Sequence, residues 1–121
     1  MGIAFFVKFV YNLPSADVRI TVMIYKEALP DGKKTRVTFE LPSSLWAERV
    51  NLVGDFNDWD TAAHEMHQAR NDGNWRITLE LPVERQYQFR YLVNGRDWYN
   101  DWHADKYLPN RFGTDNSVVC T

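Results

Sequence analysis

Apolar and polar residues alternate with a period of two along most of the chain from Val18 onward. Segment 36–41 (RVTFEL) directs valine, phenylalanine and leucine to one side and arginine, threonine and Glu40 to the other, and segment 75–81 (WRITLEL) repeats this arrangement. A period of two places alternate side chains on opposite faces of a strand, one toward a core and one toward water. Helical periodicity is missing from every window long enough to test it, so the pattern predicts an all-β protein.

Turn sequences divide the chain into short strands. Segment 87–93 (YQFRYLV) alternates in the same way and runs into Asn94-Gly95, which favours a hairpin because both residues tolerate positive φ. The next residues, RDWYN, are therefore predicted to return antiparallel, and 116–121 (NSVVCT) to form the last strand. The spacing of the turns predicts a single sandwich over residues 33–121; the other turn sequences are Pro30-Asp31-Gly32, Asn71-Asp72-Gly73 and Pro109-Asn110.

The first 32 residues are predicted to form an extension that is partly disordered or adds an edge strand, for which 18–25 (VRITVMIY) is the candidate. Met23 is a candidate start codon that would make the first 22 residues an upstream extension, a hypothesis tested by mass spectrometry of the native N-terminus. The chain start lacks the charged n-region of a secretion signal, and Lys8 splits its apolar run. Because that run is shorter than the roughly 20 apolar residues of a membrane-spanning helix, a soluble protein is expected.

The composition limits the classes of partner and the cellular compartment that we expect for this protein. The 121 residues suit one domain with one core. Lys and Arg number 14 against 16 Asp and Glu, with no basic run, which argues against nucleic acid and anionic membranes as partners and favours a neutral ligand. Cys120 is the single cysteine, so no internal disulfide can form and a reducing, cytoplasmic compartment is the simpler expectation.

The sequence contains no residues with the spacing of a known catalytic or metal-binding motif. Residues 64–67 (HEMH) do not match the HExxH zinc pattern, and the segment DFNDWDTAAHEM lacks the glycine and the glutamate of a calcium loop. The sequence also contains no GxSxG motif and no glycine loop for phosphate. We therefore expect no enzyme activity, no cofactor and no metal site, and interpret these residues as solvated loop charges.

Aromatic residues make up 15% of the chain and are the main candidates for ligand contact. Trp59 (in DFNDWD) and Trp98 (in NGRDWYND) lie in loop surroundings rich in Asp and Asn, where a core residue is less expected. An indole laid against the C–H face of a sugar gains dispersion, apolar burial and weak C–H···π contact. For Trp75, in clean alternation, core packing is the better interpretation, Trp46 is predicted to cover an end of the sandwich, and for Trp102 both interpretations stay open.

Several motifs in a fixed order resemble one known family. They are VNLVGDFNDWD (50–60), the pair Gly73 and Trp75, YQFRYLVNG (87–95), a tryptophan after that turn, and FGTDNSVV (112–119). Together they resemble the glycogen-binding carbohydrate-binding modules of family 48. This family includes the isoamylase-type N-terminal early-set (E-set) domains and the module on the AMP-activated protein kinase beta subunit. The resemblance covers about residues 35–121 and is strongest to small, free-standing bacterial members.

The resemblance implies a non-catalytic, immunoglobulin-like β-sandwich that binds α-1,4-glucans such as glycogen, starch and maltooligosaccharides, and it allows a glycogen-metabolising enzyme as a further partner. Transferred motif by motif, the carbohydrate-binding residues are Trp59, Arg90, Trp98, Phe112, Thr114 and Asn116. The kinase-type modules have lysine at the position of Arg90 and leucine at that of Phe112. Asp55, Asp58 and Asp60 are expected to hold the Trp59 loop open through local backbone hydrogen bonds.

The hairpin after residue 93 decides whether these residues share a surface. This chain has one residue more between Gly95 and Trp98 than the kinase-type hairpin. A two-residue turn would pair Trp98 with Tyr91 and direct it to the core. A three-residue loop with a bulge, 94–96, would pair Trp98 with Leu92 and place it on the face of Arg90. We predict the bulged hairpin, because it alone keeps the binding residues together.

One rival interpretation of the same residues remains. An early-set domain can keep its fold and dock a partner enzyme or a second copy of itself, and exposed aromatic surface would serve that purpose as well. Loss of self-association on adding soluble glucan would distinguish the two.

Overall fold

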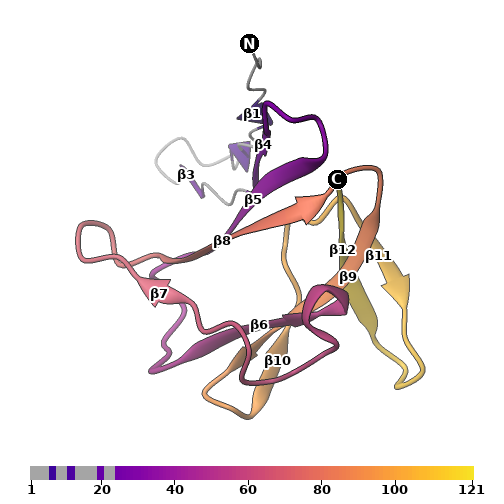
Figure 1. The fold of residues 1–121 in the computed structure, drawn as a ribbon. Coiled ribbons are helices and arrows are strands. Elements are labelled where there is room, and N and C mark those ends of the chain that lie inside the picture. Colours follow the sequence, from indigo (N-terminus) through magenta and orange to yellow (C-terminus); the bar gives the residue numbers. More distant parts are fainter. Residues whose placement is uncertain (1–5, 8–10, 13–18, 21–23) are drawn as a thin grey trace.

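The computed structural model describes residues 6–7, 11–12, 19–20 and 24–121, and its regular structure is almost entirely β (Figure 1). The elements are β1 (Phe6–Val7), β2 (Tyr11–Asn12), β3 (Arg19–Ile20), β4 (Tyr25–Ala28), β5 (Lys34–Leu41), β6 (Val50–Gly54), the 3₁₀ turn η1 (Asp55–Asn57), β7 (His67–Gln68), β8 (Trp75–Pro82), β9 (Gln86–Val93), β10 (Asp97–Tyr99), β11 (Lys106–Pro109) and β12 (Asp115–Cys120). The all-β class is thus confirmed.

Two antiparallel sheets form the immunoglobulin-like, early-set sandwich that the sequence predicts. One has the strand order β1-β4-β5-β8-β7, and the other has the order β10-β9-β12-β11 with β6 paired to β9. A separate ladder joins β2 and β3. In Figure 1, β5 and β8 run above, while β6, β9, β10, β11 and β12 lie below and to the right.

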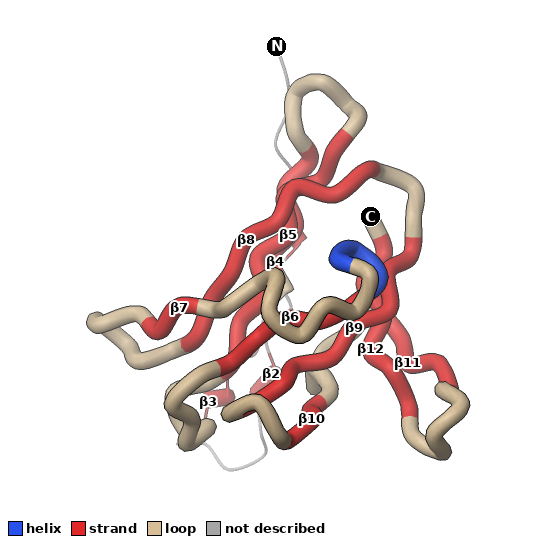
Figure 2. The backbone as a smooth tube through the Cα atoms, turned by 60° about the horizontal axis from the view of Figure 1, so that its bottom comes forward, coloured by secondary structure: helices blue, strands red, loops and turns tan. Residues whose placement is uncertain are grey.

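Strand β9 changes partner halfway along one of its edges. Its first part pairs with β12, from Gln86 to Phe89, and its last part pairs with β10, from Tyr91 to Val93. Arg90 lies between the two ladders, and β6 follows the other edge of β9. Figure 2 shows β10 and the β11–β12 hairpin leaving β9 in different directions. The residues on the outer face of the sheet at this fork line the hollow described below.

Inward-facing aromatic and aliphatic residues of both sheets fill the core. The rings of Phe39 and Phe89 meet edge to face with centroids 5.0 Å apart, and Phe89 and Tyr91 do so at 5.7 Å. Such edge-to-face pairs are a favoured geometry for aromatic side chains. Trp75 is 5% exposed, which confirms its predicted place in the core.

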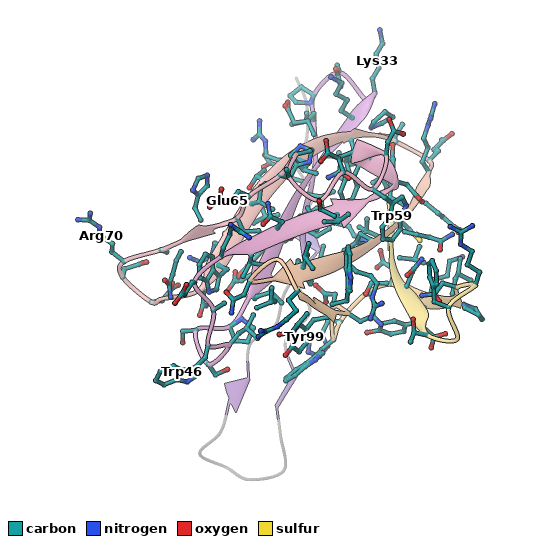
Figure 3. The ribbon with its side chains drawn as sticks, turned by 90° about the horizontal axis from the view of Figure 1, so that it is seen from below. Lys33, Trp46, Trp59, Glu65, Arg70 and Tyr99 are labelled. Carbon is teal, nitrogen blue, oxygen red and sulfur yellow. The ribbon has the colours of Figure 1, made fainter. Side chains whose placement is uncertain are left out.

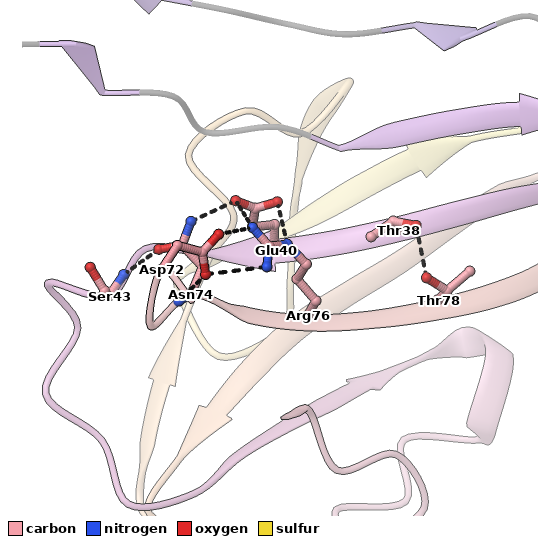
Figure 4. Close-up of polar contacts among 7 residues, drawn as sticks. All are labelled: Thr38, Glu40, Ser43, Asp72, Asn74, Arg76 and Thr78. Atoms are coloured by element: carbon pink, nitrogen blue, oxygen red, sulfur yellow. Dashed lines mark hydrogen bonds and ion pairs between the residues drawn. The ribbon is translucent and has the colours of Figure 1, made fainter. Parts of the chain in front are cut away.

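The predicted exposure of Glu40 is wrong. Its side chain is only 3% exposed, because hydrogen-bond partners on β8 and the preceding turn cover it. Arg76 Nε donates to Oε2 at 3.0 Å and Asn74 Nδ2 donates to Oε1 at 2.8 Å (Figure 4). Arg76 also pairs with Asp72. Alternation correctly predicts the face on which Glu40 lies, but not that the same face carries partners that bury it.

Strand β4 lies ahead of the expected domain boundary at residues 32 and 33. It pairs with β5 from Tyr25 to Ala28, and Ile24 is buried in the core at 1% exposure. The division into extension and module itself stays a prediction, and Met23 lies outside the described residues. Within the described part of the chain, no helix has the length and apolar character needed to cross a membrane.

Candidate functional site

A hollow of about 860 Å³ opens on the outer face of the second sheet, at the fork between β10 and β12. Its lining includes all six residues that the family resemblance brought together, although they come from widely separated parts of the chain. The complete lining is Asp55, Trp59, Thr61, Gln88, Arg90, Trp98, Asn110, Arg111, Phe112, Thr114 and Asn116. The structure therefore places the expected residues around one surface, while their role toward a ligand stays a prediction.

The hairpin register is the one predicted from the sequence. Asp97 pairs with Val93 and Trp98 with Leu92, so the loop holds the three residues 94–96. Asn94 and Gly95 have φ of 54° and 67°, and the Arg96 amide donates to the Val93 carbonyl at 3.1 Å. Because residues two apart share a face of a strand, Trp98 lies on the face of Arg90. Its side chain is 41% exposed.

The loop that carries Trp59 begins where β6 comes very close to β9. A Cβ on Gly54 would lie 2.5 Å from the Gln88 carbonyl oxygen and 2.7 Å from Phe89 Cβ, so only glycine fits. The chain then turns through η1, and Asp58 and Trp59 adopt left-handed φ of 54° and 58°. The Trp59 amide donates to the Gly54 carbonyl at 2.9 Å and closes the turn.

Asn57 and His64 stabilise this turn from within. Asn57 Oδ1 accepts from the Gly54 amide at 3.1 Å, and its Nδ2 donates to the Leu52 carbonyl at 3.0 Å. The same nitrogen lies 2.8 Å from His64 Nδ1. His64, the first residue of the HEMH segment, thus has a structural contact in the loop.

Asp55 fixes the indole of Trp59. Its Oδ1 accepts from Trp59 Nε1 at 2.9 Å, and its Oδ2 accepts from the Gln88 backbone amide at 2.7 Å. The expected local backbone bond is present at Asp60, whose Oδ1 accepts from the Ala62 amide at 2.9 Å. Asp55 instead makes a longer-range connection, because it ties both the ring and the loop to strand β9.

Asn110 organises the opposite wall, the hairpin between β11 and β12. Its Oδ1 accepts from the amides of Phe112 at 2.9 Å and Thr114 at 3.2 Å. Its Nδ2 donates to Thr114 Oγ1 at 2.8 Å and to Asn116 Oδ1 at 3.0 Å. Sequence reasoning identified Asn110 only as a turn residue. Nothing in the one-dimensional pattern shows that its side chain would connect so many lining residues.

The connections continue across the floor of the hollow. Asn116 Nδ2 donates to the side chain of Gln88, at Oε1, over 3.1 Å. The backbone N–H of Gln88 donates in turn to Asp55 Oδ2. A continuous path of hydrogen bonds thus joins the Phe112 hairpin to the Trp59 loop. Each wall is fixed relative to the other before any ligand is present.

The two arginines of the hollow differ in their surroundings. Arg90 Nε is buried and has no hydrogen-bond partner among the described residues. Arg111, which sequence reasoning missed, lies with its guanidinium carbon 5.0 Å from the centroid of the Phe112 ring, at the tip of the hairpin. Phe112 is 77% exposed. The hollow thus offers flat rings and polar groups side by side, which suits a ligand with apolar faces and a rim of hydroxyls.

Fold and hollow together define a small β-sandwich domain with an aromatic-lined surface site. Residues 25–108 match the family Carbohydrate-binding module 48 (Isoamylase N-terminal domain), and the chain belongs to this family. The match ends before Phe112, so the arrangement of the last hairpin rests on the structure.

The relatives of the chain are much longer enzymes. A 1,4-alpha-glucan branching enzyme GlgB of Mycobacterium sp. (strain KMS) is 32% identical over 90 residues, which cover 71% of this chain and 11% of the enzyme. The 1,4-alpha-glucan-branching enzyme of Saccharomyces cerevisiae is 49% identical over 45 residues, or 35% of this chain and 6% of the enzyme. The chain thus spans about a tenth or less of these relatives, and a free-standing form stays a prediction.

Proposed function

We propose that this chain binds α-1,4-glucans of the glycogen and starch type without catalysing their conversion. The observation that carries the proposal is the bulged hairpin, which brings Trp98 to the face of Arg90 and into one hollow with Trp59. A glucan chain presents the alternation of apolar ring faces and hydroxyl rims that this lining matches.

The lining residues divide into two roles. The rings of Trp59 and Trp98 stack on glucose faces, and Phe112 adds apolar contact from the hairpin tip. Hydrogen bonds to sugar hydroxyls come from the polar residues Arg90, Thr114 and Asn116. Arg90 can serve more than one hydroxyl, since its guanidinium lines the hollow and carries several donors in a fixed fork.

The absence of catalysis is part of the proposal. It is supported by the match, which covers a family of carbohydrate-binding modules and only a small fraction of the branching enzymes that are similar to this chain. In this proposal the chain delivers or retains glucan for a glycogen-metabolising enzyme, in a reducing, cytoplasmic compartment.

Native gel migration with and without glycogen in the gel tests the proposal. The wild type and Trp98→Ala are compared with Trp46→Ala, which also removes an exposed tryptophan but lies outside the hollow. We expect glycogen to retard the wild type and Trp46→Ala, and the Trp98→Ala variant to migrate freely. Free migration of the wild type, or equal retardation of all three proteins, would contradict the proposal and favour a protein partner.

A further inference from the structure

A second, smaller hollow lies on the other face of strand β10. It measures about 210 Å³ and is lined by Leu41, Pro42, Ser44, Leu45, Tyr99, Asn100 and Trp102. None of these residues lines the larger hollow. The neighbours Trp98 and Tyr99 point to opposite faces of the same strand, so the two hollows face away from each other. Figure 3 shows Tyr99 and Trp59 well apart.

Trp102 is 66% exposed although its loop is firmly held. The adjacent residue Asp101 is 1% exposed, and its carboxylate accepts from Tyr91 Oη at 2.6 Å and from the His103 amide at 2.7 Å. The Asp101 amide donates to Ser117 Oγ at 2.9 Å. Residues on both sides of Trp102 are thus bonded to buried groups, while the indole itself stays in water.

Asn100 fixes the start of the same loop. Its Nδ2 donates to the Asp115 carbonyl at 2.9 Å, and its Oδ1 accepts from Ser117 Oγ at 2.9 Å. An exposed indole on a mobile loop would lose conformational entropy on meeting a ligand, whereas a fixed loop has already lost it on folding. The loop therefore presents Trp102 in a pre-organised position.

The rim of the small hollow has polar groups that the described protein leaves unused. Three side-chain groups form no hydrogen bond with another residue in the range 24–121: Tyr99 Oη, Trp102 Nε1 and Ser44 Oγ. Leu41 and Leu45 add apolar lining to the same hollow. A flat ring, apolar lining and free hydrogen-bonding groups repeat the chemistry of the larger hollow on a smaller scale.

We propose that this small hollow is a second carbohydrate contact, in which one sugar ring of an α-glucan stacks on Trp102 beside Tyr99. The choice of an α-glucan as ligand rests on the proposed function. The volume, about 210 Å³ against about 860 Å³, suits one ring better than a run of several.

The opposed directions of the two hollows determine what they bind together. Because the hollows open on opposite faces of β10, we expect the two contacts to engage separate chains or separate branches. On a branched polymer, a second contact raises the overall avidity through the high effective concentration of neighbouring chains. Trp102 therefore contributes more to retention on glycogen than to affinity for a short linear oligosaccharide.

Indole N–H resonances in ¹⁵N NMR spectra test the two sites separately, because the chain has five tryptophans and gives one resonance for each. Single Trp→Phe variants assign the resonances, and maltoheptaose is titrated with cellohexaose as the control for linkage. We expect the Trp102 resonance to shift with maltoheptaose, in the wild type and also in Trp98→Ala. The resonance of Trp46, which is exposed but lines neither hollow, should stay in place.

The outcomes separate the second site from the first. If the Trp59 and Trp98 resonances shift and that of Trp102 does not, the second contact is overturned while the proposed function stands. If only Trp102 responds, the second contact stands and the larger hollow loses its assigned role. A Trp102 resonance that changes with protein concentration and not with sugar would show that this face docks a second copy of the chain, which also overturns the proposal.

Discussion

The indole N–H of Trp59 donates a hydrogen bond to Asp55, with 2.9 Å between Nε1 and Oδ1. The other oxygen of the same carboxylate accepts from the Gln88 amide at 2.7 Å. One side chain thus sets the direction of an aromatic ring and anchors it to a strand of the sheet. Acidic residues are unexpected next to the end of an apolar strand. The two hydrogen bonds of Asp55 explain why one of them lies beside Trp59.

Replacing Asp55 by alanine should weaken glucan binding even though no tryptophan is lost. A hydrogen bond to a charged carboxylate contributes about 1.5–3 kcal/mol, so we expect the dissociation constant for maltoheptaose to rise by about 10- to 100-fold. Isothermal titration calorimetry measures the change, and the Trp59 indole resonance should move in the free protein. Glu65→Ala is the control, since Glu65 is an exposed carboxylate that does not line the hollow; equal effects of both variants would refute a specific role for Asp55.

Deleting Arg96 should leave glycogen retention within about twofold of the wild type. Asn94 and Gly95 already have the positive φ values of a two-residue type I′ turn, and the Val93–Asp97 pair can form without a bulge. Trp98 therefore keeps its face. Affinity gels compare the deletion with the wild type, and circular dichroism checks the fold. A folded deletion variant that no longer binds glycogen would show that the bulge itself is needed.

Removing the cation beside Glu40 should destabilise the fold more than removing an exposed one. Arg76→Met leaves a carboxylate that is 3% exposed with Asn74 as its remaining partner. Loss of one partner from a buried pair costs about 3–5 kcal/mol, but the Arg76 side chain is 34% exposed, so we expect about 2 kcal/mol. Arg36→Met is the control, because the Arg36–Glu27 pair is more exposed. Urea midpoints that fall equally in the two variants would contradict this expectation.

Asp101 should make folding stability depend on pH. Burial raises the pKa of this carboxyl above its usual 3.8, although the hydrogen bonds from Tyr91 and His103 oppose the shift. Burial likewise raises the pKa of Tyr91, so its hydroxyl remains a donor. Between pH 3.8 and the raised pKa the folded state binds more protons at Asp101 than the unfolded state, so the free energy of unfolding falls as pH rises.

Asp101→Asn should remove this contribution to the pH dependence. Urea unfolding of the wild type and the variant, from pH 4 upward, gives the difference in unfolding free energy at each pH. We expect the wild type to lose stability relative to the variant as pH rises through that window. A difference that is constant across the series would mean that the two states of the wild type bind the proton equally.

The all-β class was predictable from alternation and the sandwich from the spacing of turns, while the immunoglobulin-like, early-set type was implied by the family resemblance. The hairpin register was predicted only with the help of the resemblance, because the sequence allows both turns and only the bulged one keeps Trp98 on the face of Arg90. The position of Trp46 was not predicted: it was expected to cover an end of the sandwich but is 95% exposed. Its neighbours Leu45 and Ala47 pack against the core, and the indole between them points outward.

The polar connections within the site could not be predicted for a different reason. Asn110, Asn116 and Gln88 are joined through hydrogen bonds that cross between separate strands. No periodicity in the sequence encodes such contacts, because their partners are set by the three-dimensional positions of strand ends. Trp102 illustrates the same limit, since the sequence does not show that its neighbour Asp101 would be buried and bonded to Tyr91.

Every residue of the larger hollow belongs to β9, β10, the β11–β12 hairpin, or the loop that follows β6. The site is thus built by a single sheet, and the β4-β5-β8 sheet on the other side of the core supplies none of its lining. The outer face of the β4-β5-β8 sheet can therefore vary, or contact further domains, while the ligand surface stays as it is. Such separation gives one small fold the freedom to serve in many different protein architectures.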